Sequence, residues 1–196
     1  AYVPVNKGQF NLDTDERELE FERNRGSGDP AGYAEYRREW FQNPPGKVLK
    51  EYPLHVDVEL ASVCNLKCPM CYTITEEFKT KVNTKLMSWD LYTKIIDEIG
   101  PAGVYSIRLS LRGESFLHKR IVDAISYAKS KGIREVSCLT NGVRLDEGLF
   151  KKIMEAGMDW LTISFDGINE TYERIRKPAK LRRSQTIRRS RKKQGG

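Results

Sequence analysis

Strand-like and helix-like segments alternate through the middle and later part of the chain. Apolar residues at every second position predict strands, and amphipathic segments that end at glycine predict the helices between them. A regular order of strand and helix favours a parallel sheet with right-handed crossovers, so the chain is predicted to be an α/β protein. The predicted strands are 54–60, 105–111, 135–140 and 160–165, and the predicted helices between them are 88–99, 117–131 and 145–156.

Polar residues occupy alternate positions of these predicted strands. Parallel strands that are covered on both faces normally read as continuous apolar runs, so the alternation gives the sheet one polar face. Helices outside and a polar face inside fit a barrel wall around a wet cavity; the alternative is a half-exposed sheet, which the interleaved helices disfavour. Ligands of such folds collect at the carboxyl ends of the strands. The polar positions are His55, Asp57, Glu59, Ser106, Arg108, Ser110, Thr162 and Ser164.

Three of the four cysteines, Cys64, Cys68 and Cys71, form a C-x3-C-x2-C run directly after the first predicted strand. Soft thiolate ligands favour zinc, copper(I) or an iron–sulfur cluster. Structural zinc needs four protein ligands, and neither the fourth cysteine nor either of the two histidines lies at a short zinc-finger spacing after the run. Three cysteines would leave one iron of a cubane cluster open. A partial zinc site and three unliganded thiols remain the alternatives.

The run, within SVCNLKCPMC, resembles the cluster loop of the radical S-adenosylmethionine (SAM) enzymes. The resemblance implies a partial (β/α) barrel, of which about four βα units are present here. It also implies that Cys64, Cys68 and Cys71 ligate three irons of a 4Fe–4S cluster, while the amino and carboxylate groups of SAM chelate the fourth. In that family the reduced cluster cleaves SAM to methionine and a 5′-deoxyadenosyl radical, which abstracts hydrogen from a substrate.

The segment after the second predicted strand, Arg112-Gly113-Glu114-Ser115, resembles the Gly-Gly-Glu-Pro segment that binds the SAM amino group in this family. It departs from that pattern at Arg112 and Ser115. The resemblance implies that Gly113 lets the backbone approach SAM and that Glu114 accepts hydrogen bonds from its ammonium group.

The ends of the third and fourth predicted strands carry the remaining resemblances. Thr140-Asn141-Gly142 resembles the family's turn near the SAM nucleoside, although it also fits an ordinary strand-to-helix turn. Ser164 and Arg176 match the serine and arginine that grip the SAM carboxylate in related maturases. Arg176 could instead be a surface residue of a short helix, 169–177. The remaining candidates, His118 and Cys138, are interpreted as a cap or packing residue and as a buried apolar side chain.

The chain is expected to have three parts: a helical extension (1–53), an incomplete radical SAM core (54–177) and a basic tail (178–196). The extension carries a charged helix, 13–25, and an aromatic helix that NPPG at 43–46 closes. Residues 73–87 lack a period and are expected to be a loop, either a lid or a connection. From 177 to 196 there are nine Lys or Arg and no acidic residue, so the other 176 residues carry +7 minus +9, or −2. The tail is predicted to be disordered, and specific nucleic-acid binding is not expected.

The pattern is most similar to radical SAM enzymes that carry a C-terminal, SPASM-like cysteine-rich extension, which are often peptide or protein modifiers. Four strands are found where the family's partial barrel has six, so we interpret the chain as truncated after the fourth strand. We expect an oxidoreductase or maturase-like enzyme, with a peptide or protein substrate and an electron donor such as flavodoxin or ferredoxin. No signal peptide or membrane span is predicted, which favours a cytoplasmic protein. The alternatives are a zinc-stabilised nucleic-acid-binding module and a nonfunctional remnant.

Overall fold

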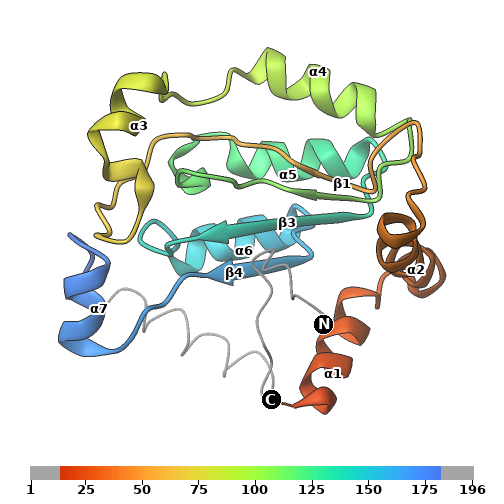
Figure 1. Cartoon of the computed structure of the whole chain (residues 1–196), viewed down its shortest axis with the longest axis horizontal. Coiled ribbons are helices and arrows are strands. Elements are labelled where there is room, and N and C mark those ends of the chain that lie inside the picture. Colours follow the sequence, from red (N-terminus) through yellow and green to blue (C-terminus); the bar gives the residue numbers. More distant parts are fainter. Residues whose placement is uncertain (1–13, 182–196) are drawn as a thin grey trace. The chain divides into compact units, whose positions relative to one another are not determined.

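The structure is a computed structural model that describes residues 14–181 of the 196-residue chain (Figure 1). The chain divides into two compact units, with the boundary in the sequence between Leu54 and His55, and each unit is described by itself. Most of the predicted basic tail, from residue 182 onward, lies outside the described residues. None of the helices in the described part of the chain combines the length and apolarity that a membrane span requires.

The second unit is built on a four-stranded parallel sheet. Its strands lie in chain order, β1-β2-β3-β4, and each pairs with the next in parallel. The prediction of an α/β fold with a parallel sheet, like the partial barrel of the family that the cysteine run resembles, is confirmed. The strands are β1 (His55–Asp57), β2 (Ser106–Arg108), β3 (Glu135–Thr140) and β4 (Trp160–Ile163).

Three of the strands are shorter than predicted, and β1 and β2 each lose four of their seven predicted residues. Just after β1, Val58 N–H still donates to the Arg108 carbonyl of β2 at 2.8 Å. The residues that follow then pair with another segment of the chain instead of β2. Met87 N–H donates to the Leu60 carbonyl at 2.9 Å, next to an antiparallel bridge between Ala61 and Leu86. The alternation of polar and apolar residues continues through this change of partner, so it could not reveal where β1 ends.

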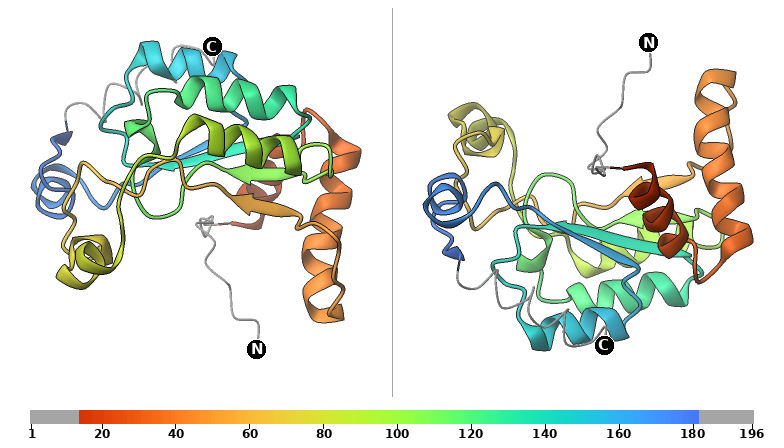
Figure 2. Two further views of the ribbon diagram at one scale, coloured as in Figure 1. Left: turned by 90° about the horizontal axis from the view of Figure 1, so that it is seen from above. Right: turned by 90° about the horizontal axis from the view of Figure 1, so that it is seen from below.

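Three helices cover one face of the sheet, as both views in Figure 2 show. They are α4 (Trp89–Ile99), α5 (Ile121–Ser130) and α6 (Glu147–Glu155). Their apolar sides meet the apolar side of the strands, and burial of this surface is the main stabilising contribution to the unit. Leu91 of α4 is an exception among the apolar residues of these helices, since it is 47% exposed. Core residues with no exposed surface include Ile96, Ile107, Leu109, Ala124, Ile125, Val136 and Ile153.

The opposite face of the sheet is polar, and its side chains bind one another across the strands. The Ser106 hydroxyl donates to Glu135 Oε1 at 2.7 Å and lies 2.9 Å from His55 Nδ1. Two positions further along the same polar face, Arg108 Nη2 donates to Asp57 Oδ2 at 2.8 Å. Burial opposes ionisation of Asp57, but hydrogen bonds from His55 and Arg108 outweigh it and hold the pKa of that carboxyl below its ordinary value.

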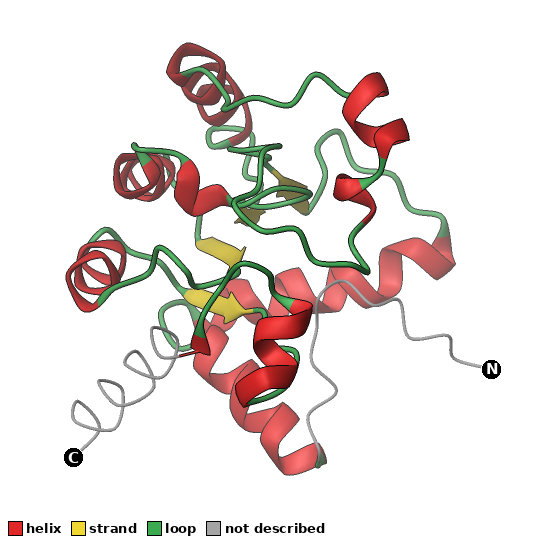
Figure 3. Ribbon diagram, turned by 90° about the vertical axis from the view of Figure 1, so that its left-hand side faces the viewer, coloured by secondary structure: helices red, strands yellow, loops and turns green. Residues whose placement is uncertain are grey.

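Short helices lie at the carboxyl end of the sheet. A 3-10 helix, η1 (Tyr72–Ile74), and α3 (Glu76–Lys81) occupy the stretch that was predicted to be a loop, and α7 (Asn169–Ile175) follows β4. Figure 1 shows α3 and α7 at this end, and Figure 3 looks onto it. The predicted helix from 117 begins only at Ile121, because a second 3-10 helix, η2 (Ser115–Leu117), precedes it.

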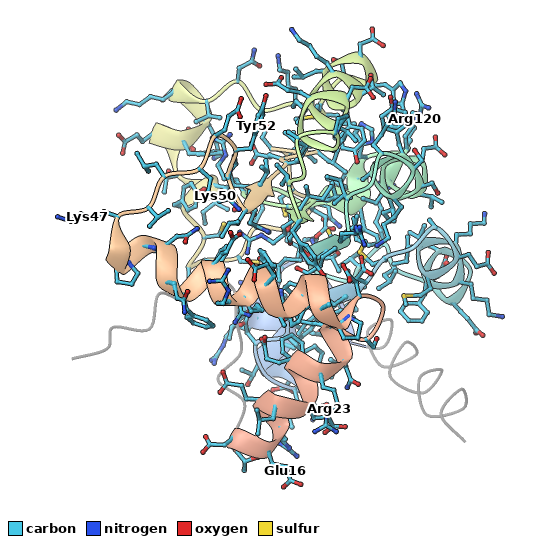
Figure 4. All side chains as sticks on the ribbon, turned by 90° about the vertical axis from the view of Figure 1, so that its right-hand side faces the viewer. Glu16, Arg23, Lys47, Lys50, Tyr52 and Arg120 are labelled. Atoms are coloured by element: carbon cyan, nitrogen blue, oxygen red, sulfur yellow. The ribbon has the colours of Figure 1, made fainter. Side chains whose placement is uncertain are left out.

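The first unit contains two helices, α1 (Asp15–Arg25) and α2 (Pro30–Gly46). Glu22 of α1 joins them, since its carboxylate accepts from the Tyr33 hydroxyl at 2.6 Å and pairs with Arg37 at 2.9 Å. The predicted aromatic stripe of α2 is covered only in part: Tyr33 is buried, whereas Phe41 is 57% exposed. Figure 4 shows the charged side chains of this unit, among them Glu16 and Arg23 of α1 and Lys47 after α2.

Candidate metal and cofactor site

The three clustered cysteines lie in the loop between β1 and η1, at the carboxyl end of the sheet. All three are free thiols; Cys64 is exposed, Cys68 buried and Cys71 partly buried. A turn in which Cys71 N–H donates to the Cys68 carbonyl at 2.9 Å brings the last two together. A second bond, from Lys67 N–H to the Lys177 carbonyl at 2.7 Å, ties the loop to the end of α7.

The three thiols do not form a site for a single metal ion within the described part of the chain. Among residues 14–181, no three His, Cys, Asp or Glu side chains converge as the ligands of one metal ion would. In a cubane cluster each thiolate binds a different iron, so its sulfur ligands lie farther apart than those around one zinc ion. The spacing that a cluster requires of its thiolates therefore differs from the spacing that one zinc ion requires.

Cys64 is exposed as a whole residue, but neighbouring atoms keep part of the solvent away from its thiol. Burial raises the pKa of Cys64, a hydrogen bond from Leu66 N–H opposes that effect, and the negative charge of Glu114 adds to it. The Leu66 N–H lies 3.4 Å from the Cys64 sulfur. Since only the thiolate ligates a metal, ligation would have to overcome this preference for the neutral thiol.

Gly113 lies where the turn after β2 crosses the chain entering the cysteine loop. A Cβ atom at this position would lie 2.3 Å from the Ala61 carbonyl oxygen and 2.4 Å from that of Val63. The next residue continues the contact, because Glu114 N–H donates to the Val63 carbonyl at 2.9 Å. Glycine is therefore required for close packing of two backbone segments. The predicted approach of Gly113 to SAM stays a prediction.

The Glu114 carboxylate is buried, with 2% of the residue exposed, and joins the ends of two strands. Its Oε1 accepts from the Thr140 hydroxyl at 2.6 Å and from Phe116 N–H at 3.1 Å, and its Oε2 accepts from Asn141 N–H at 2.7 Å. Burial raises the pKa of Glu114, and these hydrogen bonds oppose the rise. A carboxylate has about four lone-pair positions, so one is left on Oε2 for a further donor.

The two departures from the Gly-Gly-Glu-Pro pattern have structural reasons. Arg112 Nε donates to Glu59 Oε1 at 2.9 Å, and its Nη2 donates to Glu59 Oε2. The backbone N–H of Arg112 also donates to Glu59 Oε1, at 3.0 Å. This clamp ties the chain after β2 to the chain after β1. The Ser115 hydroxyl, which is buried, donates to the Leu109 carbonyl.

Asn141 connects the turn after β3 to the cysteine loop. Its Oδ1 accepts from Val143 N–H at 3.0 Å, which is the ordinary turn contact, and Gly142 has a φ of +74°. Its Nδ2 also donates to Asn65 Oδ1 at 2.8 Å and lies 3.8 Å from the Cys64 sulfur. Asn141 therefore forms an ordinary turn and also contacts the predicted metal ligands.

Ser164 and Arg176 differ in how closely they approach the loop. Ser164 N–H donates to the Thr140 carbonyl at 2.8 Å, and its hydroxyl has no hydrogen-bond partner within residues 14–181. Thr162, two positions earlier on the same face, also has a buried hydroxyl oxygen without a partner there. Arg176 Nη1 lies 3.8 Å from the Cys68 sulfur, and its Nε pairs with Asp166.

The structure agrees with the interpretations of His118 and Cys138. His118 Nε2 lies 3.0 Å from the Met87 carbonyl, and its Nδ1 accepts from Arg120 N–H at 3.3 Å, so the ring caps and packs. Cys138 is completely buried in β3. Sequence reasoning missed Thr73, whose hydroxyl lies 3.0 Å from the Cys71 sulfur, and Asn65, which binds Asn141. Neither residue belongs to a pattern that could have indicated it.

The fold and site therefore define a parallel α/β protein that carries three free thiols in the loop after its first strand, at the carboxyl ends of its strands. The model of the radical SAM superfamily matches residues 58–195, and the chain belongs to that superfamily. Membership implies a 4Fe–4S cluster and SAM as cofactors.

Among curated proteins, the chain is similar to enzymes whose names give different substrates. It is 34% identical over 131 residues to a probable GTP 3′,8-cyclase of Methanococcus maripaludis (66% of this chain, 41% of that protein). It is 34% identical over 115 residues to the Fe-coproporphyrin III synthase of Methanosarcina barkeri (58% and 27%). It is 31% identical over 126 residues to the PqqA peptide cyclase of Granulibacter bethesdensis (64% and 32%). The chain spans less than half the length of each of these relatives.

Solved structures support the fold. The structure of anSMEcpe with bound AdoMet matches with a TM-score of 0.57 and 19% identity (71% of this chain, 41% of that one). BtrN in complex with AdoMet and 2-DOIA matches with a TM-score of 0.55 and 19% identity (65% of this chain, 52% of that one). Streptococcus suis SuiB bound to precursor peptide SuiA matches with a TM-score of 0.53 and 15% identity (93% of this chain, 36% of that one). These likenesses show a shared α/β partial barrel.

Proposed function

We propose that this chain is the cofactor-binding part of a radical SAM enzyme. Cys64, Cys68 and Cys71 would hold three irons of the 4Fe–4S cluster as thiolates. Glu114 would accept from the ammonium group of SAM, and Ser164 and Arg176 would bind its carboxylate. Asn141 would contact the nucleoside from the turn after β3.

The observation that carries this proposal is that groups from all four strand ends have suitable chemistry for one zwitterionic ligand beside three thiols. Glu114 is buried and keeps one acceptor position open. The Ser164 hydroxyl has no partner within the described residues, and the Arg176 guanidinium lies 3.8 Å from the Cys68 sulfur. The acceptor position left on Glu114 and the Ser164 hydroxyl, which is unpaired within residues 14–181, offer two places where groups of a ligand would bind.

The cofactors would supply the radical chemistry, since a reduced cluster can cleave SAM and start hydrogen abstraction. The residues of this chain would orient SAM. Glu114, fixed by Thr140, Phe116 and Asn141, would hold the ammonium group without having to reorganise, because hydrogen bonds from two backbone N–H groups already fix the carboxylate.

We infer that the substrate is a peptide or a protein. The names of the relatives describe a nucleotide, a porphyrin and a peptide, so the segment that they share with this chain would serve cofactor binding, and the choice of substrate class rests on the peptide relatives alone. The peptide cyclase, and SuiB bound to its precursor peptide, support the peptide class. The electron donor would be a flavodoxin or a ferredoxin, and the protein would act in the cytoplasm.

Anaerobic reconstitution with iron and sulfide tests the proposal. We expect about four irons and four sulfides per chain, as a 4Fe–4S cluster contains. Cys64→Ala should abolish this loading, because it removes one of three thiolates. Cys138→Ala is the matched control and should retain it, since Cys138 is completely buried in β3, where its thiol lies 3.5 Å from the Leu109 carbonyl. One tightly bound zinc ion without a brown chromophore in the parent protein would refute the proposal.

The same reconstituted protein tests the substrate class. With SAM and dithionite, candidate peptides should increase the yield of 5′-deoxyadenosine, whereas GTP should leave it unchanged. Stimulation by GTP alone would show that the substrate assignment is wrong and leave the cofactor assignment intact.

A further inference from the structure

Each of the three cysteine sulfurs of the loop has a hydrogen-bond donor supplied by this chain. The donors come from separate places in the fold: the loop itself, the 3-10 helix that follows it, the turn after β3 and the end of α7. The pairs are Leu66 N–H with Cys64 (3.4 Å), Asn141 Nδ2 with Cys64 (3.8 Å), Arg176 Nη1 with Cys68 (3.8 Å) and Thr73 Oγ1 with Cys71 (3.0 Å).

Thr73 makes the shortest of these contacts, and local backbone geometry produces it. Cys71 is the N-terminal cap of η1, and Ile74 N–H donates back to the Cys71 carbonyl at 3.3 Å. This tight turn directs the side chain two residues after Cys71 back toward the sulfur. The Thr73 hydroxyl has no other hydrogen-bond partner within residues 14–181.

The direction of this hydrogen bond follows from the ionisation state of Cys71. In the free thiol either atom could donate. A thiolate that ligates iron has no proton, so the hydroxyl must donate and the sulfur must accept. The contact therefore becomes a charge-assisted hydrogen bond, which is stronger than a neutral one.

We propose that Thr73 tunes the cluster by donating a hydrogen bond to the Cys71 thiolate, as one member of an outer set that includes Asn141 and Arg176. This inference rests on the proposed function. Reduction adds one electron from a one-electron donor, forms no new bond and increases the negative charge on the sulfurs. A donor to sulfur stabilises the reduced state more than the oxidised one, so it raises the reduction potential.

Thr73 is the cleanest member of the set to test. Asn141 also binds Asn65 and Val143, and Arg176 also pairs with Asp166, so substitutions there would disturb the fold and the predicted SAM contacts. Thr73 has one partner and no predicted contact with SAM. It is a positioning residue, since it acts through Cys71.

The experiment compares Thr73→Val, which keeps the shape and removes the donor, with Thr73→Ser, which keeps the donor. Thr84→Val is the positional control, because Thr84 is exposed and its side chain has no partner in the described part of the chain. Each protein is reconstituted anaerobically, its iron and sulfide are counted, and its midpoint potential is measured by EPR-monitored titration with dithionite.

At full loading, we expect Thr73→Val to lower the reduction equilibrium constant by up to about tenfold, which is about 59 mV for one electron. Thr73→Ser and Thr84→Val should keep the parent potential. Loss of the cluster in Thr73→Val alone would also support the inference, because the hydroxyl would then be needed to hold the ligand. Equal potentials in Thr73→Val and the parent would overturn the inference without affecting the proposed function. If the parent assembles no cluster, both are wrong.

Discussion

At the scale of single residues, Gly113 shows how closely the site depends on backbone contacts. Its Cα lies against the chain that leads into the cysteine loop, and a Cβ atom would approach two carbonyl oxygens of that chain to 2.3 and 2.4 Å. Backbone atoms cannot move aside as the end of a flexible side chain can. The first cysteine is therefore positioned by a glycine that follows another strand.

Gly113→Ala is expected to destabilise the protein by about 1–3 kcal/mol, the usual cost of forcing extra atoms into a packed site, and to reduce iron loading. Gly148→Ala is the control, because the nearest atom to its added Cβ, Asp146 Oδ1, lies 3.5 Å away in ordinary contact. This control should stay within about 1 kcal/mol of the parent. Urea denaturation measures both, and equal stability of the two variants would contradict the backbone-contact account.

The sequence predicts some of these residues and not others, for a physical reason. Thiol ligands are spaced locally, so the positions of Cys64, Cys68 and Cys71 could indicate a metal loop without knowledge of the fold. The contact of Asn141 with Asn65 joins residues 76 positions apart and exists only once strand ends lie side by side. The Thr73 contact depends on a 3-10 turn, which has no sequence period that could be recognised.

At the scale of elements, the helices that carry an amphipathic pattern could be predicted, and the short ones could not. α3 has six residues, of which Phe78 alone is buried. It is held because the Phe78 ring packs edge-on against Tyr72, with 5.4 Å between centroids, and the Arg112 guanidinium lies over it at 5.8 Å. One buried residue gives no periodic pattern of apolar positions, so the sequence of this segment predicts a loop.

The start of α4 provides a test of its N-terminal cap, Ser88. Ser88 Oγ accepts from Leu91 N–H at 3.3 Å, as an N-cap should. Ser88→Ala is expected to cost about 1 kcal/mol, since a helix N–H loses its partner. Ser126→Ala, on the exposed side of α5, should cost nothing measurable because alanine is a better helix former. Thermal or urea unfolding distinguishes them, and an equal effect of both substitutions would count against the cap.

At the scale of the whole molecule, the order of strands and helices was sufficient to predict a parallel sheet, because right-handed crossovers leave few other arrangements. The resemblance of the cysteine run to radical SAM enzymes agrees with the family match over residues 58–195. The structure divides the chain into two units between Leu54 and His55, and the expected division into extension, core and tail stays a prediction. The individual substrate could not be predicted beyond the peptide or protein class, since relatives that share this segment have names that describe different substrates.

The central claim is that three thiolates leave one iron of the cluster open to SAM. EPR spectra of the reduced, reconstituted protein with and without SAM test it most directly. We predict that SAM changes the spectrum of the parent protein and of Cys138→Ala, because its amino and carboxylate groups would bind the open iron. An unchanged spectrum at saturating SAM, in protein that carries about four irons per chain, would contradict the claim.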